Sequence, residues 1–78
     1  MPKNQLLTEN DLAALARRYR KAAGKNRSET GRELNVSHVS VFRAEEYPEE
    51  SLLKLRVRMI EAYSPFQVVG PVFYLEKK

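Results

Sequence analysis

The sequence predicts a mainly α domain, a compact unit of four short helices with a short β-strand or hairpin at its C-terminal end. Three observations lead to this fold class. Apolar residues recur at helical spacing, Gly and Asn stand where helices would end, and β-branched and aromatic residues dominate residues 65–78. A chain of 78 residues makes one domain, 1–78, with a small core.

The first helix is expected at residues 9–23, after a short flexible arm at residues 1–7. Thr8 is a suitable N-cap, and Asp11 stands three residues later, where it can complete a capping box. Gly24 tolerates a positive φ and therefore ends the helix. Local signals thus mark both ends of this helix.

Residues 26–46, NRSETGRELNVSHVSVFRAEE, are the most informative stretch and predict two short helices joined by a tight turn. Asn26 and Glu29 form a second candidate capping box where the second helix begins. Asn35 is the best non-glycine residue for a left-handed turn, and Ser37 caps the third helix. This layout is that of a helix-turn-helix, whose second helix enters the DNA major groove.

Gly31 lies inside the second helix, where it costs about 1 kcal/mol relative to Ala. A helix this short tolerates such a cost only for a reason. We expect a close approach of the next helix, residues 38–46, which a larger side chain would block. That third helix would then be the recognition helix.

A fourth helix is expected to begin at Pro48 and to end at Tyr63, before Ser64-Pro65. Its apolar residues form two rows about 100° apart around the axis. The rows are Leu52, Leu55, Met59 and Ala62, and Leu53, Val57 and Ile60. One row would serve the core and the other a second surface, and the sequence leaves open which is which.

The tail contains two strand segments, residues 66–69 and 72–75, around Gly70-Pro71. They fit either a tight hairpin or a single bent edge strand. An isolated hairpin is marginal in water, so the tail must pack on helices or pair with a second chain. We therefore expect a homodimer whose seam combines helix four with the tail, through Leu53, Val57, Ile60, Phe66, Val68, Val72, Phe73 and Leu75.

The charge is unevenly placed along the chain. Residues 1–43 carry nine Lys and Arg side chains against four Asp and Glu, whereas residues 44–78 carry five against six. A basic half favours a face that meets a polyanion, and the plain alternative is a solubilising basic surface.

Several other classes of function find little support in the composition. There is no Cys and only one His, so neither a metal site nor a cofactor is expected. No acid–base constellation or Gly-rich phosphate loop is visible, so we do not expect an enzyme. The absence of a long apolar run predicts a cytoplasmic, nucleoid-associated protein.

Residues 26–60 resemble the phage Cro/repressor-type (Xre-type) helix-turn-helix family. The matching positions are Gly31, the turn Leu34-Asn35-Val36-Ser37, Val41, Ala44, Glu45, Pro48 and the run SLLKL at 51–55. The chain departs from the family at three positions. It has Arg27 where many members have Gln, Asn35 where the turn usually has Gly, and Ala44 where Ile or Leu is usual. The resemblance implies a transcriptional regulator that binds palindromic operator DNA as a dimer.

On this interpretation the recognition helix presents its base-contacting residues at its start and on its outer face: Ser37, His38, Val39, Phe42 and Arg43. Backbone phosphates would be contacted by Arg17, Arg18, Lys21, Arg27, Arg32 and Ser40. Neutralising about six phosphates would give a salt slope of about −5.

Individual roles within these two sets stay open. Arg43 could read a guanine or hold a phosphate, and His38 could be a DNA contact or a solvated side chain. Phe42 either packs on a thymine methyl or tucks against the first helix, and Val39 has a similar choice between a thymine methyl and half-burial.

A different class of function fits the same fold. The chain could be a protein-interaction module, antitoxin-like or an adaptor for the transcription machinery, which does not read DNA sequence. The apolar surface of helix four and the tail edge would then bind another protein. Substitution of Arg43 and His38 would separate the two hypotheses.

Overall fold

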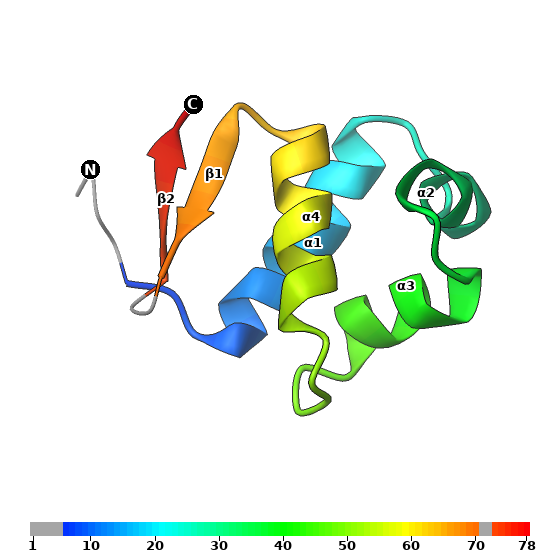
Figure 1. Cartoon of the computed structure of the whole chain (residues 1–78), viewed down its shortest axis with the longest axis horizontal. Helices are drawn as coiled ribbons and strands as arrows, with labels where there is room; N and C mark the ends of the chain where they lie inside the picture. Colours follow the sequence, from blue (N-terminus) through cyan, green and yellow to red (C-terminus); the bar gives the residue numbers. More distant parts are fainter. Residues whose placement is uncertain (1–5, 71–72) are drawn as a thin grey trace.

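The computed structural model describes residues 6–70 and 73–78, which form four α-helices followed by a two-stranded antiparallel hairpin (Figure 1). The elements are α1 (Glu9–Ala22), α2 (Arg27–Leu34), α3 (His38–Glu46), α4 (Leu53–Tyr63), β1 (Phe66–Val69) and β2 (Tyr74–Lys77). The predicted fold class is confirmed. Residues 1–5 of the expected arm and Val72 lie outside the described residues.

The caps of the first helix form as the sequence predicts. The Thr8 hydroxyl accepts from the Asp11 N–H at 3.2 Å, and the Asp11 carboxylate accepts from the Thr8 N–H at 2.9 Å. The helix ends one residue early, at Ala22, and Gly24 takes a φ of +73°. The local signals therefore place both ends of α1 to within a residue.

The second and third helices also begin where expected. Asn26 and Glu29 exchange side-chain to backbone hydrogen bonds at 2.7 and 2.9 Å, which is a complete capping box. Asn35 takes the left-handed conformation with φ +59°, and the Ser37 hydroxyl accepts from the Ser40 N–H at 3.0 Å.

The core lies between α1, α3 and α4. Figure 1 shows α1 and α4 crossing at the centre, with α2 and α3 on one side of this pair and the hairpin on the other. The apolar side chains that are fully enclosed are Leu12, Ala16, Val41, Ala44, Met59 and Ile60. The hairpin therefore sits away from the α2–α3 pair.

The prediction that the fourth helix begins at Pro48 is wrong, because α4 begins at Leu53. The preceding segment is a succession of turns, in which the Glu50 N–H donates to the Tyr47 carbonyl at 3.0 Å and the Leu52 N–H donates to the Glu50 carbonyl at 2.8 Å.

Arg56 on α4 explains these turns, since its side chain is fully buried. Its guanidinium donates from Nε to the Ala44 carbonyl at 2.8 Å and from Nη2 to the Tyr47 carbonyl at 2.7 Å. Its Nη1 donates to Glu9 Oε1 on α1 at 3.0 Å. A buried guanidinium needs these acceptors, so the end of α3 and the segment after it fold around Arg56 instead of continuing into α4.

The buried face of α4 mixes the two predicted rows. Leu55 and Met59 come from one row and Ile60 from the other, while Ala62 is exposed. Ile60 is 0% exposed, so the prediction that it lies on a dimer seam is wrong and it is a core residue. Leu53 and Val57, by contrast, stay partly exposed on the helix surface.

The tail is a hairpin, not a single bent strand. Val68 pairs with Leu75, and β2 lies two residues further along the chain than predicted. Val68, Phe73 and Leu75 pack against the core, and the Phe66 ring lies 6.4 Å from that of Tyr19. The predicted seam residues of the tail that the structure describes are thus half-buried against their own chain: Phe66, Val68, Phe73 and Leu75.

No helix in the described part of the chain combines the length and the apolar character needed to cross a bilayer.

Candidate nucleic-acid interface

The turn between α2 and α3 packs directly on the backbone of α2 at Gly31. A Cβ on this residue would lie 2.7 Å from the Val36 carbonyl oxygen and 3.2 Å from the His38 nitrogen. The Val36 N–H donates to the Gly31 carbonyl at 2.8 Å. The expected close approach is confirmed, and the contact comes from the turn and from the first residue of α3.

The third helix divides into an inward and an outward face. Val41, Ala44 and Glu45 are buried. The structure brings the predicted base-contacting residues together on the exposed surface of this helix and its N-cap: Ser37, His38, Val39, Phe42 and Arg43. Ser40 is half-buried, and its hydroxyl lies 3.0 Å from that of Ser37, so it supports the cap.

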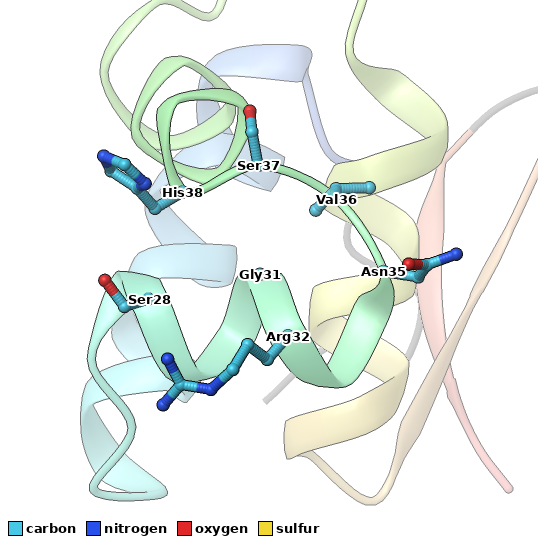
Figure 2. A pocket seen from close by; sticks show the side chains of 7 residues that line it. All are labelled: Ser28, Gly31, Arg32, Asn35, Val36, Ser37 and His38. Carbon is cyan, nitrogen blue, oxygen red and sulfur yellow. The ribbon is translucent and has the colours of Figure 1, made fainter.

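A hollow of about 490 Å³ opens between α2 and the start of α3 (Figure 2). Figure 2 shows Ser28 and Arg32 on α2, and Ser37 and His38 at the start of α3, around this hollow. Hydroxyl, guanidinium and imidazole groups therefore surround it. Ser28 was not predicted from the sequence, although its position four residues before Arg32 places both on one face of α2.

A buried ion pair joins α1 to α3. Arg20 donates to Glu45 from Nε at 2.5 Å and from Nη2 at 3.0 Å, and its Nη1 donates to the Lys25 carbonyl at 2.8 Å. Arg20 is 5% exposed and Glu45 is 6% exposed. Arg20 was not singled out from the sequence, although its spacing of four from Ala16 puts it on the buried stripe of α1.

Arg27 stands at the start of α2 beside three side chains of α3. Its Nε donates to Glu45 at 3.1 Å and its Nη2 donates to Glu46 at 3.1 Å. Its guanidinium lies 4.9 Å from the centroid of the Phe42 ring, which meets Tyr47 edge-on at 5.7 Å. The Phe42 ring thus contacts Arg27 and Tyr47, and neither contact is with α1, which was one of the two alternatives for this side chain.

The predicted phosphate contacts fall into two groups. Arg17 and Arg27 both pair with Glu46, at 3.6 and 3.1 Å. Arg18, Lys21 and Arg32 are exposed and form no salt bridge within residues 6–70 and 73–78. Arg18 lies on the side of α1 opposite its buried residues, so the helix points it away from the core on which α3 packs.

Hydrogen bonds join the C-terminal half of α2 to Tyr63 of α4 and to Lys25, which lies in the loop between α1 and α2. Tyr63 donates to Glu33 at 2.5 Å, its hydroxyl oxygen lies 3.2 Å from that of Thr30, and Lys25 donates to Glu33 at 2.7 Å. The hydrogen bonds from Lys25 and Tyr63 lower the pKa of Glu33, and the same bond to Glu33 raises the pKa of Lys25. Burial, followed by the hydrogen bond to Glu33, raises the pKa of Tyr63.

Comparison of the chain with protein-family models, with curated proteins and with solved structures finds no match in any of the three. The resemblance to the Cro/repressor-type family stays a prediction. Within the described ranges, no group of three or more His, Cys, Asp or Glu side chains is placed to hold a metal ion.

Proposed function

We propose that this protein is a sequence-specific double-stranded DNA-binding transcriptional regulator that acts as a homodimer, with α3 in the major groove. The observation that carries the proposal is the outward face of α3. It presents His38, Val39 and Arg43 to solvent, while Arg20 and Glu45 hold the helix from behind. A rigid helix with exposed polar and apolar groups suits the reading of base edges.

The hollow between α2 and α3 supports the proposal because its groups suit a backbone phosphate. Arg32 supplies charge, and the Ser28 hydroxyl and the His38 ring can donate hydrogen bonds. A phosphate there would lie beside the start of α3, where the helix dipole also favours an anion. Contacts of this kind set the register of the protein on the duplex.

The dimer would use surface that the monomer leaves partly exposed. Leu53 and Val57 on α4 are candidates for this interface. We add Val69 and Tyr74 of the hairpin, which are half-buried and pair across the two strands. A symmetric dimer would set its two recognition helices about 34 Å apart, one turn of DNA. Val57→Asp should weaken dimerisation in sedimentation analysis, and an unchanged dimer would exclude this surface.

The DNA-binding test is selection of bound duplexes from a random library at about 150 mM salt, followed by sequencing. An enriched motif is expected for the natural chain and loss of that enrichment for Arg43→Ala combined with His38→Ala. Lys77→Ala is the matched control, since Lys77 is an exposed cation on the hairpin, away from α3 (Figure 1). Bulk, salt-sensitive binding without a motif would contradict sequence-specific reading.

One observation favours the alternative, a protein-interaction module of the same fold. A second hollow of about 660 Å³ lies between α3 and the start of α4, and its lining is more apolar than the first. Val36, Leu52, Leu53 and Leu55 supply the apolar part. Retained binding to a protein partner by the Arg43→Ala, His38→Ala variant, with no DNA motif for either chain, would support this alternative.

A further inference from the structure

Val39 points most directly away from the body of the domain. The buried residues Val41, Ala44 and Glu45 define the inward face of α3. At about 100° per residue, Val39 lies opposite the middle of that face. Its side chain is 46% exposed and takes no part in the core.

The neighbours of Val39 on the helix surface are Phe42, Arg43 and Glu46, at positions i+3, i+4 and i+7. The Phe42 ring already has Arg27 over its face at 4.9 Å and Tyr47 at its edge. Glu46 accepts from Arg27 at 3.1 Å. Val39 is 46% exposed against 37% for Phe42, so its isopropyl group is the more open of the two apolar groups on the outward face.

An exposed valine at this place has a cost. A β-branched side chain is a weaker helix former than Ala or Lys, and its apolar surface meets water. On a helix in the major groove, an isopropyl group set against polar base-edge atoms would desolvate them without a hydrogen bond. The apolar group that a pyrimidine shows in the major groove is a 5-methyl group, which thymine always carries.

We infer, resting on the DNA-binding function proposed above, that Val39 reads a pyrimidine 5-methyl group in each half-site. Arg43 lies four residues on, about 6 Å away along the same face. The base pair it meets therefore lies within about two base pairs of the methyl group, at 3.4 Å per step. Val39 is thus a specificity-determining residue, and thymine is the expected base opposite it.

The test changes the DNA and leaves the protein intact. Selection is run on two random libraries, one with thymine and one with uracil, which pairs identically but lacks the methyl group. The thymine library should yield a motif with a fixed thymine in each half-site, and the uracil library the same motif without that preference. On one selected duplex, thymine to uracil at that position should weaken binding about fourfold, as expected for one buried methyl group.

Two protein variants assign the effect to the side chain. Val39→Ala should bind the thymine and uracil duplexes equally well, and should keep the preference that depends on Arg43. Lys77→Ala, at an exposed position of the hairpin away from α3, should keep the full fourfold discrimination. Two further duplexes, with cytosine or 5-methylcytosine at the same position, show which methylated base is recognised. Tighter binding of the 5-methylcytosine duplex would show that either methylated pyrimidine is read, and equal binding would restrict the reading to thymine.

Equal binding of thymine and uracil duplexes by the natural chain would overturn the role of Val39 while leaving the proposed function intact, because a motif would still exist. Discrimination that survives in Val39→Ala would assign the methyl contact to another residue. No motif in the thymine library would remove the proposed function itself, and the inference with it.

Discussion

Glu45 accepts two hydrogen bonds from the guanidinium of Arg20, at 2.5 Å from Nε and 3.0 Å from Nη2, across 25 residues of sequence. Both side chains are almost fully enclosed. Arg27 adds a third bond to the same carboxylate at 3.1 Å. The carboxylate of one α3 residue is thus held by cations of α1 and α2, which fixes the direction in which the outward face of α3 points.

Removing one member of this pair should be costly. Glu45→Gln leaves the buried Arg20 charge without its counter-ion, and we expect a loss of about 3–5 kcal/mol in the free energy of unfolding, measured by urea denaturation. Glu46→Gln is the control, because its ion pairs are exposed and worth about 1 kcal/mol or less. Replacing both Arg20 and Glu45 by Met should recover much of the loss. Equal losses for Glu45→Gln and Glu46→Gln would contradict the buried pair.

Gly31→Ala should destabilise the protein although alanine is the better helix former. The added Cβ would lie 2.7 Å from the Val36 carbonyl oxygen, so the turn has to move, at a cost of about 1–3 kcal/mol. Ala14→Gly on the exposed side of α1 makes the reverse change and should also lose about 1 kcal/mol. A Gly31→Ala protein with a higher Tm than the natural chain would show that the turn is not tightly packed.

The ion pairs of α3 should reduce the salt dependence of DNA binding. Arg17 and Arg27 are paired with carboxylates. Arg18, Lys21, Arg32 and Arg43 form no ion pair within the described residues, and Arg18 points away from the core on which α3 packs, which leaves three free cations. Three phosphate contacts give a slope of log K against log salt of about −3, shallower than the slope of about −5 expected from sequence. Arg32→Gln should make the slope shallower by about 1, and Lys77→Gln should not change it.

Stability should fall at both ends of the pH range through Lys25, Glu33 and Tyr63. The pKa of Glu33 is lowered, so its contribution is complete above the ordinary glutamate value of about 4.3 and is lost as the pH falls through the lowered pKa. The pKa values of Lys25 and Tyr63 are raised, so their contribution is complete below about pH 10 and is lost as the pH rises through the raised values.

Thermal unfolding as a function of pH measures this effect. Glu33→Gln removes the shared carboxylate, so its Tm should vary less with pH than that of the natural chain on both the acid and the alkaline side. Glu49→Gln, at an exposed position after α3, is the matched control and should keep the natural profile. A Glu33→Gln profile that matches the natural one would show that the network does not couple to folding.

The parts of the fold that sequence predicts well are those set by neighbours in the chain. Thr8 with Asp11, and Asn26 with Glu29, act within one helical turn, so their caps are readable without a tertiary structure. The left-handed Asn35 is local in the same sense. The turn at Asn35 and the cap at Ser37 fix where α3 begins, and helical periodicity then predicts which of its residues are exposed.

The parts that sequence missed depend on distant partners. The start of α4 is set by Arg56, whose acceptors lie on Glu9, Ala44 and Tyr47. The burial of Arg20 requires Glu45, on another helix. A cation on an amphipathic helix is usually exposed. Only the packing of α1, α3 and α4 against one another shows that Arg20 and Arg56 are buried. The same meeting turned Ile60 inward.

The most direct measurement of the central claim is methylation interference on a selected duplex. Dimethyl sulfate modifies guanine N7, which lies in the major groove, and adenine N3, which lies in the minor groove. With α3 in the major groove of each half-site, guanine N7 methylation should block binding in two clusters about 10 base pairs apart, and adenine N3 methylation inside those clusters should not. Interference from adenine N3 alone, or from neither position, would contradict the placement of α3 in the major groove.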